Sequence, residues 1–166
     1  MKRHDFDKLI RLMENPTRRK ILELLCRENQ YPLQLSKTLN TSQQAISKHL
    51  KTMEKEGIVV SKTSKSKFGG PPTKTYKVNT EFSLRIDMGP TLFKTEVGEI
   101  ETEKVDEYKE LEEEVEKDDD EGYLLDKRKA LDEIEKEIEG LERKRNYLIK
   151  LKEKALEKSY EYIHKN

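Results

Sequence analysis

The side chains best suited to chemistry are polar groups that repeat along one stretch, residues 41–57. At helical spacing, one face of this stretch carries Gln43, Gln44, Ser47, Lys48 and Lys51. The opposite face carries Ile46, Leu50 and Met53, at i, i+4 and i+7. Thr41 or Ser42 can cap the first turn, and Gly57 can supply the left-handed residue that ends a helix. We therefore predict a helix over residues 42–56 that packs with one face and exposes the other.

The exposed face is suited to hydrogen bonding with nucleic acid. Gln amides can bond to adenine edges, and Lys side chains can contact phosphates. A solvated helix face is usually rich in both Glu and Lys, whereas no acidic residue occurs from Thr41 to Met53. The sequence thus predicts a DNA-recognition helix, and we expect Thr41 and Ser42 at its start to contact DNA as well.

Three shorter helices are predicted before it. The first, over residues 6–13, has Phe6, Leu9, Ile10 and Met13 at helical spacing. Asn15 as N-cap and Pro16 as first helical residue begin the second helix. That helix is expected to bury Ile21, Leu22, Leu24 and Leu25. Pro32 opens the third, which places Leu35 and Leu39 in the core and ends at the turn residue Asn40, so the order is helix, short turn, recognition helix.

After Gly57 the pattern becomes strand-like. Two β-rich runs, residues 58–62 and 75–78, are joined by a loop rich in Lys, Ser, Gly and Pro, which predicts a long hairpin. No acid occurs between Glu56 and Glu81. The cations along the hairpin are Lys62, Lys65, Lys67, Lys74 and Lys77. Beside a recognition helix, such a hairpin is a wing that presents cations to DNA; the alternative is a solvated loop.

Charge divides the chain into two halves. Residues 1–80 carry 17 Lys or Arg against 7 Asp or Glu, a balance of +10, and residues 81–166 carry 17 against 27, a balance of −10. We expect nucleic acid to meet the first half only. With 41% charged and 33% hydrophobic residues, a single core of full length is not expected. One Cys and the lack of a signal peptide or long apolar run predict a soluble intracellular protein without an internal disulfide.

The second half begins with an alternating apolar pattern, Phe82, Leu84, Ile86 and Met88, which predicts a half-buried strand ended by Pro90. We expect this strand to extend the wing sheet or to pair across a dimer axis. Residues 99–121 contain 14 acids and three Lys. Within them, residues 103–117 are predicted to form a weakly amphipathic helix, and residues 118–122 a break before the next helix.

Residues 123–164 predict one long helix with a heptad seam. The predicted dimerisation residues are Leu124, Leu131, Ile134, Ile138, Leu141, Leu148 and Leu151. Because an apolar stripe of this length must be covered, the helix is expected to fold back on residues 103–117, to pair with a second subunit, or both.

The sequence contains no motif of a catalytic or metal-binding centre. Cys26 stands alone and is interpreted as a small filler near the core. His4, His49 and His164 are scattered, and His49 is expected to have a structural or phosphate-contact role. No Gly-rich phosphate loop, Ser-His-Asp grouping or paired carboxylates support catalysis, so neither an enzyme nor a metal or other cofactor is expected.

The stretch from ENPTRRKILELL to LSKTLNTSQQAISKHLKTMEKEGIV resembles the winged helix-turn-helix domain of ArsR-type repressors, in which SQxxxSxHL is a strong local signature. The continuation GGPPTKTYKV and GPTLF is similar to the archaeal heat-shock regulator branch of that class, where a helical dimerisation half follows the winged half. The resemblance implies that Gln43, Gln44, Ser47 and Lys48 contact bases or nearby phosphates, and that the wing touches DNA.

The expected architecture is mainly α with a small β-wing: residues 1–98 form a winged helix-turn-helix DNA-binding domain, and residues 99–166 an acidic linker helix with a long dimerisation helix. The predicted function is a cytoplasmic, homodimeric transcription regulator that represses by binding an inverted-repeat operator in double-stranded DNA and occluding a promoter. No membrane partner is expected. The alternative is a winged-helix module that docks protein within the basal transcription apparatus.

Overall fold

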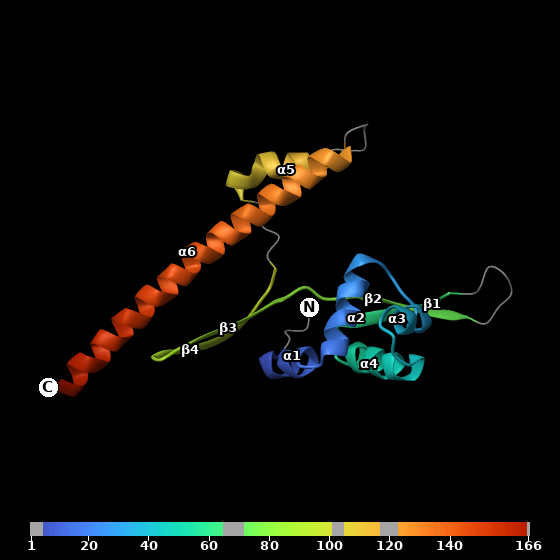
Figure 1. Cartoon of the computed structure of the whole chain (residues 1–166), viewed down its shortest axis with the longest axis horizontal. Coiled ribbons are helices and arrows are strands. Elements are labelled where there is room, and N and C mark those ends of the chain that lie inside the picture. Colours follow the sequence, from blue (N-terminus) through green and yellow to red (C-terminus); the bar gives the residue numbers. More distant parts are fainter. Residues whose placement is uncertain (1–4, 65–71, 101–104, 117–122, 166) are drawn as a thin grey trace. The chain divides into compact units, whose positions relative to one another are not determined.

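The computed structural model describes residues 5–64, 72–100, 105–116 and 123–165, and it divides into two compact units (Figure 1). The first unit comprises residues 1–85 and 95–100, and the second comprises residues 86–94 and 101–166. The fold is mainly helical with two small β-hairpins; the sequence predicted the helical content and the first hairpin. No helix in the described parts of the chain is long and apolar enough to cross a membrane.

Four helices make up the helical part of the first unit: α1 Phe6–Met13, α2 Pro16–Arg27, α3 Pro32–Thr38 and α4 Gln43–Lys55. The starts of α2 and α4 follow the predicted caps. The Asn15 side chain accepts a hydrogen bond from the Arg18 backbone N–H at 3.0 Å, and Ser42 Oγ accepts one from the Ala45 N–H at 3.2 Å. Each cap satisfies an N–H that has no partner inside the helix, which fixes where the helix begins.

The core of the first unit combines the inward faces of these helices with the base of the wing. Its buried members are Leu9, Leu12, Ile21, Leu25, Leu35, Ile46, Leu50, Met53, Ile58, Val59 and Tyr76. Leu12 was not among the expected core residues, and Leu22, Leu24 and Leu39 are only partly buried against this cluster. Full burial of a Leu or Ile side chain contributes roughly 1.5 to 3 kcal/mol, so this cluster stabilises the unit and fixes the position of α4.

The wing is an antiparallel hairpin of β1 Val59–Ser64 and β2 Thr73–Val78, with Val59 opposite Val78 and Lys62 opposite Thr75. Gln30, between α2 and α3, joins its edge through two backbone hydrogen bonds with Tyr76, of 2.8 and 3.2 Å. This bridge ties the base of the wing to the helical core.

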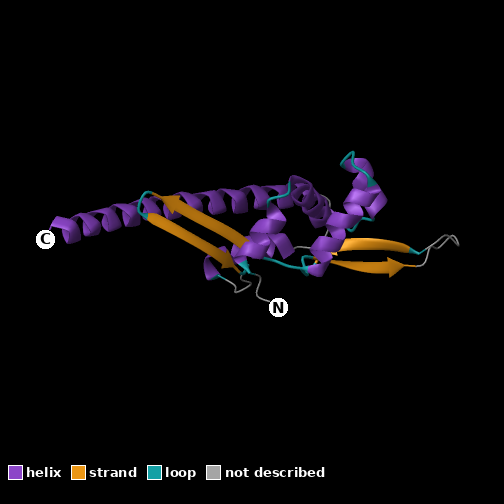
Figure 2. Cartoon of the chain, turned by 90° about the horizontal axis from the view of Figure 1, so that it is seen from below, coloured by secondary structure: helices purple, strands orange, loops and turns teal. Residues whose placement is uncertain are grey.

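The next strand corrects the sequence-based expectation. β3 Ser83–Gly89 pairs with β4 Leu92–Gly98 in a second two-stranded sheet and does not join the wing (Figure 2). The reason is the turn at Pro90 and Thr91, which reverses the chain so that residues 92–98 become the partner strand. The expected alternation also holds only at the start, because Leu84 packs against the core whereas Ile86 and Met88 are exposed.

The second unit is built on one long helix, α6 Tyr123–Lys165. The preceding acidic segment forms a 3-10 turn, η1 Asp106–Tyr108, and then α5 Lys109–Glu116, which packs along α6. Residues 103, 104 and 117 of the predicted linker helix lie outside the described residues. The tip of the β3–β4 hairpin belongs to this unit: Arg145 of α6 pairs with Asp87 at 2.6 Å, and Thr91 Oγ1 donates to the Glu153 carbonyl at 3.3 Å.

Candidate nucleic-acid interface

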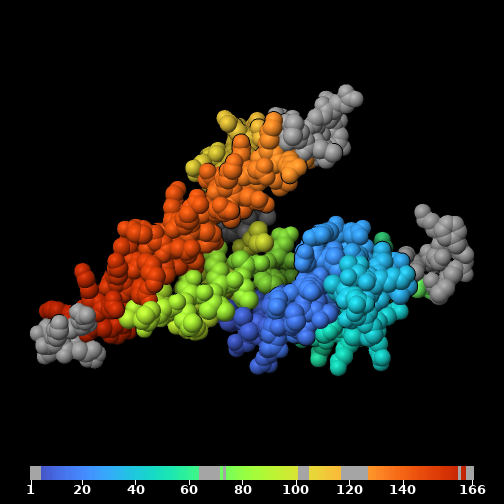
Figure 3. Space-filling model, viewed as in Figure 1, coloured from blue at the N-terminus to red at the C-terminus, as the bar shows by residue number. Residues whose placement is uncertain are grey.

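Helix α4 presents the polar face that the sequence predicted. Figure 3 shows residues of this part of the chain, coloured cyan, at the molecular surface. The side chains of Gln43, Gln44, Lys48 and Lys51 are exposed, and that of Ser47 is half-buried. A shallow open groove runs along this face. It is lined by Ser42, Gln44, Ala45, Ser47, Lys48, Lys51, Thr52 and Lys55. The groove therefore collects amides, hydroxyls and cations on one side of one helix, the groups that contact base edges and phosphates.

Two polar lining residues, Thr52 and Lys55, were not among the predicted site residues. Their signal was available, because Thr52 lies four residues after Lys48 and Lys55 four residues after Lys51, on the same side of the helix. Lys55 extends the cationic side of α4 by one turn.

The turn before α4 fixes how this face is presented. Asn40 has a φ of 47°, a left-handed conformation that Asn tolerates better than most residues. The Thr41 N–H then donates to the Ser36 carbonyl at 3.0 Å, and Ser42 caps α4 through its hydroxyl. Thr41 is half-buried and Ser42 is exposed, so both lie at the start of the polar face while the backbone around them is tied to α3.

At the other end of α4, Gly57 has a φ of 79°. This left-handed conformation is the one that the sequence pattern assigned to Gly57, and it lets the chain leave the helix directly into β1.

The wing presents its cations unequally. Lys62 and Lys77 are exposed, whereas Lys74 Nζ forms an ion pair with Glu54 of α4 at 3.1 Å and lies 5.0 Å from the Tyr76 ring centroid. The predicted contact residues Lys65 and Lys67 lie outside the described residues. Ser61 of β1 also donates a hydrogen bond to Glu54. Lys74 thus connects the loop end of strand β2 to α4.

These contacts shift the pKa values of Glu54 and Lys74. The hydrogen bond from Ser61, followed by the contact with Lys74, lowers the pKa of Glu54. The neighbouring Tyr76 and then Glu54 raise the pKa of Lys74. Both groups are therefore charged at neutral pH, and their pairing removes part of the positive charge expected on the wing.

His49 lies half-buried on α4. Burial, followed by the positive charges of Arg18 and Lys48, lowers the pKa of His49 from its ordinary value of 6.5. Arg18 is itself fixed, since its Nε donates to the Leu12 carbonyl at 2.6 Å and its Nη2 to the Arg11 carbonyl. His49 is thus neutral at pH 7 and lies half-buried near Arg18 of α2.

The interpretation of Cys26 as a core filler was wrong, because its side chain is exposed. Ile21 and Leu25 of α2 point into the core at i and i+4, and a residue directly after Leu25 is turned about 100° away from that face. Within the described part of the chain, no three His, Cys, Asp or Glu side chains gather as metal ligands would. His4 and the side chain of His164 are not among the described groups.

Most of the predicted dimerisation residues are uncovered in the single chain. Leu131, Ile138, Leu141, Leu148 and Leu151 are exposed, by 57, 55, 50, 63 and 44% respectively. Ile134 is half-buried on the side of α6 where Ala130 is fully buried. The Leu124 side chain is outside the described set. Of the predicted seam residues whose side chains are described, only Ile134 is half-buried, so the folding back of α5 leaves most of the seam uncovered.

A family model described as "bacterial regulatory protein, arsR family" matches residues 15–61, which span α2 to α4 and the first residues of β1. No curated protein gives a match to this chain. The narrower resemblance to the heat-shock regulator branch is tested by neither comparison and stays a prediction.

Among solved structures, HlyU from Vibrio cholerae is 30% identical over 44% of this chain and 73% of that chain, with a TM-score of 0.37. The transcriptional regulator HlyU from Vibrio vulnificus is 30% identical over 45% of this chain and 71% of that chain, with a TM-score of 0.37. A MarR-family regulator from Enterococcus faecalis is 17% identical, with coverages of 48% and 73% and a TM-score of 0.39.

The family match falls on the helix-turn-helix and on the polar face of α4. With the hairpin wing that follows, these features define a DNA-binding transcription regulator and not an enzyme. The helix-turn-helix segment of this chain, residues 15–61, belongs to the ArsR family of regulators.

Proposed function

We propose that this chain is a sequence-specific repressor that acts as a homodimer in the cytoplasm and occludes a promoter. The observation that carries the proposal is the polar face of α4, where Gln43, Gln44, Lys48 and Lys51 are exposed on a helix of a matched helix-turn-helix. In the proposed complex this face enters the major groove, where the Gln amides read adenine edges and the lysines contact phosphates.

The wing is proposed to add contacts to the phosphate backbone. Lys62 and Lys77 are exposed on its two strands, and the sequence between the strands contains Lys65 and Lys67. Lys74 is proposed to have a different role, because its side chain forms the ion pair with Glu54 that links the wing to α4. Each phosphate contact releases a counterion, so the wing is expected to contribute affinity without sequence preference.

The homodimer is proposed from the uncovered apolar stripe on α6. Five large side chains at the predicted seam positions are 44% or more exposed in the single chain, and soluble proteins rarely leave a continuous apolar stripe in water. Residues 1–98 would then bind DNA and residues 99–166 would join the subunits. A two-fold dimer predicts an inverted-repeat operator whose half-sites are about 34 Å apart, one turn of DNA.

Selection of bound fragments from a random duplex library tests the proposal. An enriched inverted repeat with half-sites about 10 base pairs apart is expected. Lys48→Ala should weaken binding to the selected site, whereas Lys158→Ala on α6, with the same loss of charge, should not. If no sequence is enriched, or if both variants lose equal affinity, then α4 does not read the DNA sequence and Lys48 contributes only non-specific charge.

A further inference from the structure

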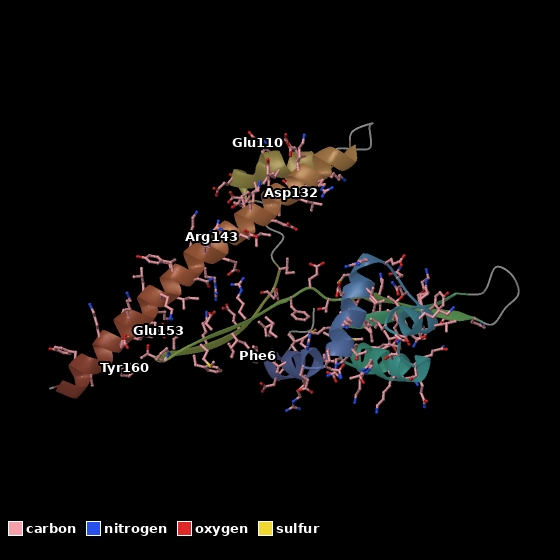
Figure 4. All side chains as sticks on the ribbon, viewed as in Figure 1. Phe6, Glu110, Asp132, Arg143, Glu153 and Tyr160 are labelled. Carbon is pink, nitrogen blue, oxygen red and sulfur yellow. The ribbon has the colours of Figure 1, made fainter. Side chains whose placement is uncertain are left out.

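Helix α6 carries two adjacent segments of equal length and opposite charge. Residues 131–142 contain six acids and one Lys, and residues 143–154 contain six bases and one acid. The balances are −5 and +5, with the change of sign between Glu142 and Arg143. Asp132, in the acidic segment, and Arg143, at the start of the basic segment, are labelled in Figure 4.

Helix α5 strengthens the acidic segment. It contains five acids and one Lys and packs along α6. Tyr108, directly before it, lies near the acidic segment, since partial burial together with the carboxylates of Glu107 and Glu137 raises the pKa of Tyr108. The part of the second unit around residues 131–142 is therefore more acidic than α6 alone.

Contacts within the chain leave the basic segment positive. Arg145 pairs with Asp87, and Lys150 pairs with Glu153 at 2.8 Å. Arg143 lies 4.0 Å from Glu139, with both side chains more than 70% exposed, an arrangement that contributes little. Lys144, Lys152 and Lys154 are exposed. Asp87 and Glu153 thus offset part of the charge, and the exposed surface of residues 143–154 keeps a positive excess.

The exposed apolar stripe crosses both segments. Leu131 and Ile138 lie in the acidic segment, and Leu148 and Leu151 in the basic one. Helix α5 has 8 residues, about 12 Å, whereas the two segments together extend about 36 Å at 1.5 Å per residue. α5 therefore cannot cover the stripe, and a second long helix is required.

We propose that this helix is α6 of a second copy of the chain, in antiparallel orientation, with residues 131–142 of each copy against residues 143–154 of the other. The proposal rests on the proposed homodimer and adds its orientation. A parallel pair would place −5 against −5 and +5 against +5, whereas an antiparallel pair centred between residues 142 and 143 places each charge against its opposite. The same centre places Ile138 beside Leu148 of the second copy, so the apolar positions meet as well.

Spin-label distances test the orientation. In the full chain, Cys26→Ser removes the exposed native thiol, and a single label is placed at Arg128→Cys, Arg143→Cys or Lys158→Cys, all at exposed positions. In the antiparallel dimer, residues 128 lie 29 residues apart along the pair and residues 158 lie 31 apart, which is about 44 and 46 Å. The label at residue 143 should give a distance under about 25 Å, since packed helices are about 10 Å apart.

Short distances at all three positions would establish a parallel pair and overturn the proposal. A monomer in sedimentation would overturn it too, because no second copy would then cover α6. A gel shift on the selected operator distinguishes failure of the dimer proposal from failure of the DNA-binding proposal. A monomer that still binds one half-site would support DNA reading by α4 although the dimer proposal fails.

Charge reversal gives an independent test with a definite sign. Glu135→Lys with Glu137→Lys removes attraction in the antiparallel dimer and should weaken dimerisation by roughly tenfold. In a parallel dimer the same changes relieve repulsion and should strengthen it. Adding Lys152→Glu and Lys154→Glu lowers the two balances to −1 and +1, so an antiparallel dimer should weaken further, whereas a parallel dimer should strengthen again. Circular dichroism of each variant checks that it is still helical.

Discussion

Lys74 of the wing and Glu54 of the recognition helix form an ion pair of 3.1 Å, although they lie twenty residues apart in the chain. Their side chains are 44 and 30% exposed. A pair so open to solvent contributes at most about 1 kcal/mol to stability, but it decides which cations of the wing are available to DNA.

Glu54→Gln should therefore strengthen DNA binding. The change frees Lys74 for a phosphate, so affinity for a random duplex should rise and the slope of log affinity against log salt should steepen by about one. Fluorescence anisotropy at several salt concentrations measures this. Glu23→Gln is the control, since Glu23 pairs with Arg27 on α2 at 3.0 Å. If Glu54→Gln leaves both affinity and slope unchanged, Lys74 lies outside the DNA interface.

Gln43→Ala and Gln44→Ala should each weaken binding to the selected operator by roughly 1 to 3 kcal/mol and random duplex by much less. Both side chains are exposed on α4, so their removal should not change the melting temperature. Competition assays with operators altered at single positions would locate each contact. Equal losses on operator and random duplex would make the two residues positioning contacts rather than reading contacts.

Acidification should destabilise the first unit through His49. The pKa of His49 in the folded protein is lowered from 6.5, so the folded state disfavours the charged imidazole. The contribution of neutral His49 to the free energy of unfolding is complete above the pKa of His49 in the unfolded chain. It is lost as the pH falls through the lowered pKa of His49 in the folded protein. Chemical denaturation between pH 7.5 and about 5 should show this loss, and His49→Gln should reduce the slope. An identical pH dependence in both proteins would assign the effect to carboxylates.

Replacing Leu131, Ile138 and Leu141 together with Lys should produce monomers. Charges at these positions could not be buried against a second helix without a large cost. The first unit has a separate core, so these monomers should keep a folded winged domain but lose most operator affinity, because the two half-sites no longer bind together. Sedimentation and a gel shift on one preparation measure both effects. If the triple variant remains dimeric, the dimer interface lies outside the apolar stripe of α6.

The sequence by itself determined the local features of the chain. Asn15 and Ser42 mark the starts of α2 and α4, and Gly57 marks the end of α4. The heptad pattern predicts one helix over residues 123–164, where the structure has α6 Tyr123–Lys165. Each of these depends on side chains within a few residues of one another, so a pattern read along the chain contains the information. The polar face of α4 was predictable for the same reason, since helical spacing alone divides inward from outward residues.

Only the tertiary structure decided which distant groups meet. The pairing of β3 with β4, the link from Lys74 to Glu54 and the contact of Asp87 with Arg145 each join residues whose separation in the chain carries no periodic signal. The error on Cys26 was of another kind, since helical spacing already turns the residue after Leu25 about 100° away from the inward face of α2. Local hydrogen bonds and periodicity specify elements, whereas the fit between their surfaces specifies contacts.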